Sequence, residues 1–198
     1  MASPADRAET ARELREEAYA LLSESGLFAL LQETFTDPVV TGSASYDLMV
    51  WRDIDIYLAV EADRWVEWMA FGTTLVQLFD DAGMPLHEAS YINDWVDSHP
   101  LGPGLYWGLR FKDRSGNAWK VDIWGWEPFD YAVRQAREYS LKVDLNDCDR
   151  DLILRLKTEA RLRDNYYGVR VSGYDIYQFA IAKAGDSLSA LELWKMKQ

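Results

Sequence analysis

Acidic and β-branched residues alternate at the start of the segment 53–60, which predicts a strand with one polar and one apolar face. In the run Asp53-Ile54-Asp55-Ile56, side chains two residues apart share a face, so the two carboxylates project together, roughly 7 Å apart. The isoleucines then point into the core. Two carboxylates on one face repel each other unless a cation lies between them. Hard oxygen ligands of this kind suit Mg²⁺, which also takes ligands from substrate phosphates.

Other periodic patterns predict an α+β fold, in which a mixed or antiparallel sheet carries flanking helices and is followed by a helical C-terminal region. Further strands are expected at about 39–40, 88–96, 105–112 and 118–126, and later helices at about 129–142 and 149–163. Asp63 is expected to cap a helix whose buried side carries Trp65, Met69, Gly72, Val76 and Phe79. We divide the chain into a sheet-containing domain, 1–142, and a helical region packed on it, 143–198.

A third acid and a glycine-serine turn complete the pattern. Asp122 lies between Val121 and Ile123, so it projects alone from a strand whose opposite face is apolar. If this strand lies beside the one that carries the acidic pair, three carboxylates converge. Gly42 and Ser43 follow a short apolar strand, where a glycine lets the backbone approach a ligand and a serine hydroxyl can hold phosphate oxygens.

This combination resembles the nucleotidyltransferase superfamily, and within it the small enzymes that modify lincosamide and aminoglycoside antibiotics. The resemblance covers residues 39–60 and 118–126 directly, and the helical C-terminal region is consistent with it. One departure concerns a second glycine after Gly-Ser and a serine before Asp-x-Asp, which many members carry. Tyr46-Asp47-Leu48 and Trp51-Arg52 stand there instead, which leaves the acceptor's identity open.

The resemblance implies a catalytic domain at 1–142 that transfers a nucleoside monophosphate from an NTP to a hydroxyl of a small acceptor, with release of pyrophosphate. Asp53, Asp55 and Asp122 are then the catalytic residues and ligands of Mg²⁺, with two ions expected. Asp122 completes the metal site or takes the acceptor proton as general base. Gly42 and Ser43 bind the β- and γ-phosphates. Aminoglycosides, lincosamides, other hydroxylated metabolites and a protein side chain all fit as acceptors.

Two other interpretations compete with this one. The chain can be a non-catalytic protein of the same fold, such as a toxin–antitoxin partner, although retention of all three acids argues against lost metal binding. A glycosidase that uses a carboxylate pair is weaker, because that chemistry does not require Gly42 and Ser43. For Asp122 alone, a simple ion pair with Lys120 is the structural alternative.

Composition limits the kinds of binding partner and cellular environment that the chain suits. The 198 residues include 21 Lys and Arg against 33 Asp and Glu, and the net charge of −12 disfavours extended nucleic-acid binding. The single cysteine, Cys148, excludes an intramolecular disulfide. A charged N-terminal stretch and the lack of any run of about 20 apolar residues lead us to expect a cytoplasmic protein without a membrane span.

The remaining candidates are aromatic and basic residues. Trp65, Trp68 and Trp194 are expected in the core, whereas Trp51, Trp107, Trp124 and Trp126 are candidates for lining a pocket. Four arginines are expected on a mostly solvated helix face, from which one reaches a phosphate: Arg150, Arg155, Arg161 and Arg163.

Overall fold

The computed structural model describes residues 3–96 and 102–198 and has a five-stranded mixed sheet at its centre. The strands are β1 (Thr36–Thr41), β2 (Asp53–Ala59), β3 (Leu86–Asn93), β4 (Leu105–Lys112) and β5 (Ala118–Trp126). Their order across the sheet is β1-β2-β5-β4-β3. Only the β2–β5 pair is parallel among these neighbours. The predicted mixed sheet with flanking helices is confirmed, and β3 begins and ends earlier than expected.

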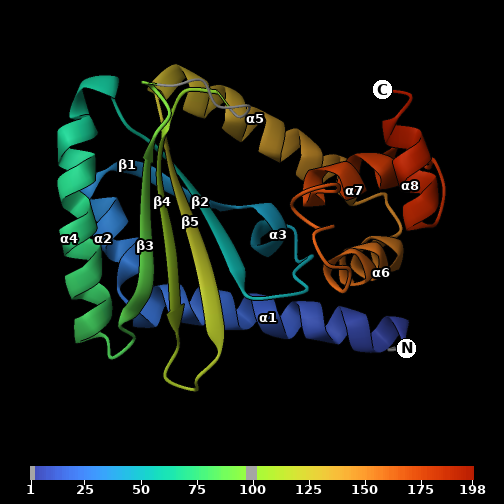
Figure 1. Cartoon of the computed structure of the whole chain (residues 1–198), viewed down its shortest axis with the longest axis horizontal. Coiled ribbons are helices and arrows are strands. Elements are labelled where there is room, and N and C mark those ends of the chain that lie inside the picture. The colour runs from blue at the N-terminus through green and yellow to red at the C-terminus, as the bar shows by residue number, and fades with distance from the viewer. Residues whose placement is uncertain (1–2, 97–101) are drawn as a thin grey trace.

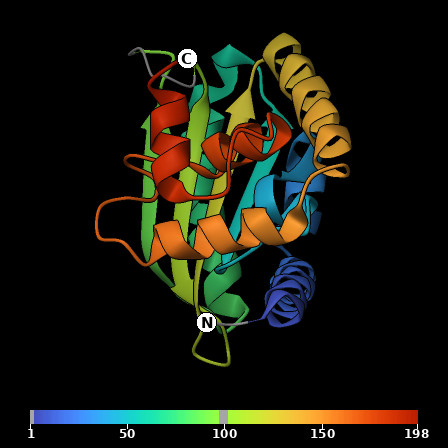
Figure 2. The same cartoon turned by 90° about the vertical axis from the view of Figure 1, so that its right-hand side faces the viewer.

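The helices form two groups. On the N-terminal side are α1 (Pro4–Glu24), α2 (Leu27–Thr34), the one-turn α3 (Gly42–Ser45), the 3₁₀ turn η1 (Ala62–Arg64) and α4 (Trp65–Asp81). After the sheet come α5 (Pro128–Leu145), α6 (Arg150–Arg161), α7 (Gly173–Ile181) and α8 (Leu188–Lys195). Figure 1 places α2 and α4 over one face of the sheet and α6–α8 beyond the opposite face. Figure 2 shows this C-terminal group from the front.

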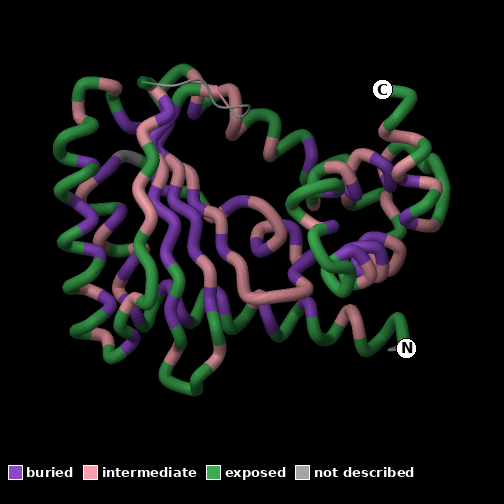
Figure 3. The backbone as a smooth tube through the Cα atoms, in the orientation of Figure 1, coloured by how far each residue is buried: buried purple, intermediate pink, exposed green. Residues whose placement is uncertain are grey.

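Two hydrophobic cores result from this arrangement. The first lies between the sheet and α1, α2 and α4, and it includes the fully buried Ile54 and Ile56 of β2 with Val121 and Ile123 of β5. The second joins α6, α7 and α8 to the loop after α3. Purple segments in Figure 3 follow both cores. The predicted inward orientation of these alternating apolar residues is therefore confirmed.

The long helix α1 belongs to both cores. Its N-terminus is capped by Ser3, whose side chain accepts from the Asp6 amide while the Asp6 side chain accepts from the Ser3 amide. Ala11 packs with the C-terminal helices, whereas Leu14 and Ala18 pack under the sheet. In Figure 1 this helix runs beneath both parts of the molecule.

The expected buried face of α4 was right at Gly72 and Phe79 and wrong at its other three residues. Its buried residues are Trp68, Phe71, Gly72, Leu75 and Phe79, whereas Trp65, Met69 and Val76 are exposed. Asp63 lies in η1 and does not cap α4, because Arg64 holds the cap position without a side-chain hydrogen bond. Trp68 is in the core as expected, and Trp194 is partly buried against the second core. None of the helices in the described ranges has the length and apolar character needed to cross a membrane.

Candidate active site

The three acids predicted from the sequence lie on the face of the sheet opposite α2 and α4. In the parallel β2–β5 pair, Asp55 is the direct partner of Asp122, and Asp53 is the direct partner of Lys120. Neighbouring strands lie about 4.8 Å apart, so the register brings the carboxylates within reach of a common centre. The adjacency of these strands, which the sequence left open, is therefore established.

Gly42 places the turn after β1 directly against this cluster. It adopts a left-handed conformation with φ of +62°, and a Cβ atom added there would lie 2.5 Å from Oδ2 of Asp55. Only glycine combines this backbone conformation with so close an approach to a carboxylate. Ser43 follows on α3 and is half-buried, and its hydroxyl forms no hydrogen bond among the described residues. The turn that was predicted to hold phosphates therefore faces the acids.

Glu138 of α5 binds the residues on both sides of this turn. Its carboxylate accepts hydrogen bonds from the hydroxyls of Thr41, at the end of β1, and of Tyr46, just after α3. Burial, followed by the bond to Glu138, raises the pKa of Tyr46, so this hydroxyl stays protonated and donates. A single side chain on α5 thus fixes both ends of α3.

Lys120 lies between two of the three acids. Its Nζ is 2.5 Å from Oδ2 of Asp122 and 3.3 Å from Oδ1 of Asp53. Burial by itself lowers the pKa of Lys120, but the two carboxylates outweigh burial and hold that pKa above its ordinary value. The ion pair between Lys120 and Asp122 thus exists together with the acid cluster and does not replace it.

The remaining charges of the cluster are not balanced. Removal from water raises the pKa of Asp55 well above its usual value, and the negative charges of Asp53 and Asp122 add to this effect. Burial also raises the pKa of Asp122, although Lys120 opposes the shift. Tyr106 of β4 donates a hydrogen bond of 2.9 Å to Oδ1 of Asp122. One cation among three carboxylates therefore leaves the site in need of further positive charge.

The acids fit a divalent cation, provided that Lys120 moves away from them. As arranged here, no group of three acidic, histidine or cysteine side chains in the described part of the chain is set to hold a metal ion. Oδ1 of Asp53 is buried without a hydrogen bond, however, and the Lys120 ammonium occupies the position between this carboxylate and Asp122. Carboxylate oxygens are the ligands that Mg²⁺ prefers, and the ammonium acts there as a stand-in cation.

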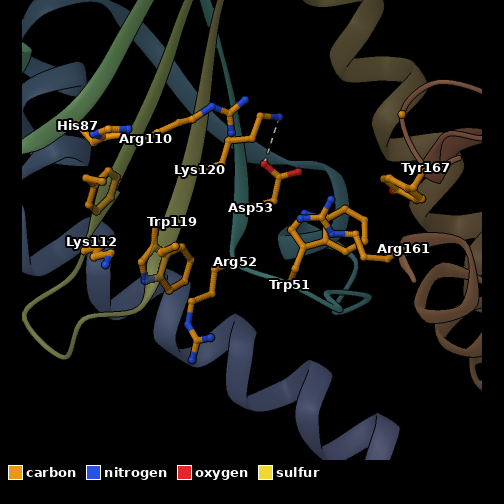
Figure 4. A pocket seen from close by; sticks show the side chains of 13 residues that line it. Trp51, Arg52, Asp53, His87, Arg110, Lys112, Trp119, Lys120, Arg161 and Tyr167 are labelled. Atoms are coloured by element: carbon orange, nitrogen blue, oxygen red, sulfur yellow. Dashed lines mark ion pairs between the residues drawn. The ribbon is translucent and has the colours of Figure 1, made fainter. Parts of the chain in front are cut away.

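A groove with a volume of about 540 Å³ lies beside the cluster, and Asp53 is the one acid of the three that lines it. Asp53 and Lys120 lie near its middle, between the sheet on one side and α6 with the loop before α7 on the other (Figure 4). The C-terminal wall carries Arg161 and Tyr167, and Trp51 from the loop before β2 lies against both. The guanidinium of Arg161 is 5.1 Å from the Trp51 ring centre, and the Tyr167 ring is 4.5 Å from it.

Arg161 is thus the arginine of α6 that reaches the site. The other three members of the expected basic face are held elsewhere: Arg150 by Asp47, Arg155 by Glu159, and Arg163 over the ring of Tyr166. Of the tryptophans expected to line a pocket, Trp51 does so, while Trp107 is buried beneath the sheet and donates to the backbone of α4.

Lys157 supports the site from inside the second core. It is almost fully buried one turn before Arg161, and its Nζ donates to the Leu48 carbonyl at 2.7 Å and to the Tyr177 hydroxyl at 3.0 Å. Removal from water lowers its pKa to about 7. The ammonium lies 5.3 Å from the Trp51 ring centre, so the wall that carries Arg161 is tied to the loop before β2.

Replacing Gly42 by alanine tests whether this turn must contact Asp55. The matched control is Gly116→Ala, because Gly116 also has a positive φ, of +85°, but a Cβ atom added there would meet no other atom within 4 Å. Both variants carry the backbone penalty of about 1–2 kcal/mol. We expect Gly42→Ala to lose about 1–3 kcal/mol more in urea unfolding, from steric conflict with the carboxylate. Equal losses would show that the turn relaxes without disturbing Asp55.

Lys157→Met tests the buried ammonium through the pH dependence of stability. Above pH 7 the folded protein releases this proton while the unfolded chain retains it up to about pH 10.4, so wild-type stability rises with pH in that window. The methionine variant lacks this gain. Its free energy of unfolding relative to wild type should therefore fall by about 3 kcal/mol between pH 7 and pH 9.5. The exposed Lys197→Met is the control, and a pH-independent difference for Lys157→Met would contradict the buried charge.

Several solved structures have a fold similar to that of this chain. A mutant of the Cid1 poly(U) polymerase bound to MgATP gives a TM-score of 0.54 at 15% identity, over 83% of this chain and 48% of that one. The GLD-2/RNP-8 complex gives 0.52 at 14% identity, over 88% and 64%. The c-di-GMP synthase CdnE from Capnocytophaga granulosa gives 0.51 at 12% identity, over 85% and 59%.

These similarities concern the fold and part of each neighbour. The chain spans about half the length of the Cid1 structures. Neither a protein-family model nor a curated protein sequence matches it. At this level of identity, the comparison establishes architecture and leaves activity to be argued from the site. The chain has the nucleotidyltransferase-type fold, built around a five-stranded mixed sheet with flanking helices.

Proposed function

We propose that the protein is a metal-dependent nucleotidyltransferase that transfers a nucleoside monophosphate from an NTP to a hydroxyl of a small acceptor. One observation supports this most directly: β2 and β5 pair in the register that sets Asp55 beside Asp122, and Gly42 contacts the same carboxylate. The fold shared with Cid1 and CdnE agrees with it. Neighbouring structures are described with MgATP and MgGTP, which favours an NTP as donor here.

In this proposal, each residue acts according to its position. Asp53, Asp55 and Asp122 hold Mg²⁺, with two ions expected, which neutralises charge on the transferring phosphoryl group and the leaving pyrophosphate. Gly42 and Ser43 contact the β- and γ-phosphates, since the turn lies against Asp55 and the Ser43 hydroxyl is unpaired among the described residues.

The wall formed by α6 and the following loop completes the donor site. Arg161 supplies a positive charge to the groove that Asp53 lines, and Trp51 with Tyr167 offers aromatic faces beside it. A phosphate chain needs cations and a nucleobase needs a flat apolar partner, so the NTP lies between this wall and the Gly42 turn. Asp122 accepts the proton of the acceptor hydroxyl as that oxygen attacks the α-phosphorus.

Asp55→Asn tests the assignment of the acids. The variant keeps the size of the side chain but removes a charge that binds the metal. We therefore expect pyrophosphate release from a mixture of labelled NTPs, Mg²⁺ and a panel of hydroxylated acceptors to fall by about 100- to 1,000-fold. The control is Asp63→Asn, an acid in η1 away from the groove, which should retain full activity. An Asp55→Asn protein as active as wild type would overturn the catalytic site.

A second candidate, a non-catalytic regulatory protein of this fold, is favoured by one observation. Lys120 already neutralises Asp53 and Asp122, as a structural substitute for a metal ion would. In such a protein the ammonium is permanent, whereas in the enzyme a divalent cation displaces it. The two candidates therefore differ in what Lys120 does when metal is supplied.

Lys120→Met separates these two candidates. Without the competing ammonium, the carboxylates of a metal-binding enzyme should bind Mn²⁺ about tenfold more tightly, as measured by electron paramagnetic resonance of the free ion. A matched variant, Lys120→Arg, keeps the charge and should bind Mn²⁺ no more tightly than wild type. If neither wild type nor Lys120→Met binds Mn²⁺, with or without NTP, the non-catalytic candidate is favoured.

A further inference from the structure

The groove continues from the acids across the outer face of the sheet, away from Arg161 and Tyr167. There it is bordered by three positively charged side chains that we call the cationic strip: Lys120 of β5, and Arg110 and Lys112 of β4. His87 of β3 lies beside them. Figure 4 shows Arg110 and His87 on this side of Lys120. Apart from Lys120, which also contacts Asp53 and Asp122, the strip plays no part in the donor site proposed above, and it borders the part of the groove that the donor leaves free.

The register of β4 and β5 orders the groups on this face into rows. Arg110 is the direct partner of Lys120, and Gly108 is the direct partner of Asp122. Because side chains on one face repeat every second residue, successive rows lie about 7 Å apart. Like charges directly opposite each other on neighbouring strands destabilise a sheet, so the Arg110–Lys120 pair lowers the stability of this fold. Binding of an anion between the two side chains would offset that loss of stability.

Acidic side chains neutralise the strip only in part. Glu88 lies 3.6 Å from Arg110, but both side chains are half exposed, so this pair contributes little. Lys112 is exposed and has no ion pair in the described ranges. Lys120 loses its partners once a metal ion takes the carboxylates of Asp53 and Asp122. In the loaded site, the strip therefore becomes more positive than in the structure described here.

The row on the other side of Asp122 is aromatic. Tyr106 and Trp124 are direct partners, their ring centres lie 4.6 Å apart, and both are half-buried. The Tyr106 side chain covers Gly108, and a Cβ atom added to Gly108 would lie 2.1 Å from the Tyr106 hydroxyl. The same hydroxyl donates a hydrogen bond to Asp122. Along the sheet, the order is thus cation, carboxylate, aromatic. A nucleotide carries phosphate, ribose hydroxyls and base in the same order.

Charge limits the size and kind of the acceptor. Five of the residues that line the groove are Lys or Arg and one is acidic, in a chain whose net charge is −12. A polycationic aminoglycoside is repelled by such a groove, while a long polyanionic strand is repelled by the acidic remainder of the surface. A small anion with a hydroxyl satisfies both limits.

We propose that the acceptor is a small nucleotide, held by its phosphate on the cationic strip and by its base against Tyr106 and Trp124. This inference rests on the proposed function and names its second substrate. The acceptor's ribose hydroxyl oxygen forms a bond to the α-phosphorus of the NTP, and the bond from that phosphorus to the oxygen bridging to the β-phosphate breaks. Pyrophosphate leaves with that bridging oxygen, and the hydroxyl proton passes to the carboxylate of Asp122.

The experiment compares AMP with adenosine, which differ only in the phosphate. Transfer of label from an α-³²P-labelled NTP mixture is measured with each as acceptor, together with an aminoglycoside and a 20-nucleotide RNA. Wild type should prefer AMP over adenosine in kcat/KM by about tenfold or more. Arg110→Ser combined with Lys112→Ser should remove this preference by lowering kcat/KM for AMP to about the value for adenosine. A control with the same loss of charge, Lys183→Ser with Lys197→Ser, alters two exposed lysines outside the groove and should behave as wild type.

Direct binding separates failure of this inference from failure of the enzyme assignment. AMP binding to the protein, saturated with Mg²⁺ and a non-hydrolysable NTP, is followed by calorimetry with and without the two serine substitutions. Tenfold weaker AMP binding in the substituted protein supports the strip even if no transfer is detected. Equal binding of AMP and adenosine, or a preference for the aminoglycoside or the RNA, overturns the nucleotide acceptor. Absence of both NTP binding and label transfer overturns the proposed function itself, and this inference with it.

Discussion

The parallel pairing of β2 with β5 is the constraint on which the rest of the site depends. This register alone sets Asp55 beside Asp122 and Asp53 beside Lys120, on the face that the buried isoleucines leave free. The three carboxylates there repel one another in partly dehydrated surroundings, and the single ammonium of Lys120 only partly offsets this repulsion. The cluster therefore favours the binding of a further cation. The turn at Gly42 closes against these acids because its backbone has no Cβ to keep the Asp55 carboxylate away.

The sequence predicts the parts of the fold in which burial on one side imposes a strict alternation. Ile54 and Ile56 are assigned to the core correctly, because polar residues stand at every other position around them. The face of α4 is assigned wrongly, because apolar residues occur on all sides of that helix and periodicity no longer distinguishes the buried side. Trp65 and Val76 satisfy the helical spacing as well as Trp68 and Leu75 do, and only the packing partners decide between them.

Some residues of the candidate site can be identified from local sequence patterns, and others only from the tertiary structure. Asp53, Asp55, Asp122, Gly42 and Ser43 carry local patterns, so the sequence names them, although strand order becomes known only from the structure. Lys120, Arg161 and Lys157 carry no such pattern: their place near the acids depends on which strands and helices become neighbours. From the sequence, Lys120 is only an ion-pair partner of Asp122, and Arg161 is one of four equivalent arginines until α6 is placed against the groove.

One further consequence concerns α1. Near its start Arg7 pairs with Asp151 of α6, and farther along Glu17 pairs with Arg52 beside β2, so this single helix is fastened to both walls of the groove. The two attachment points are ten residues apart, about 15 Å along the helix axis. A change in the distance between the two walls would therefore require α1 to shift or one of these ion pairs to break.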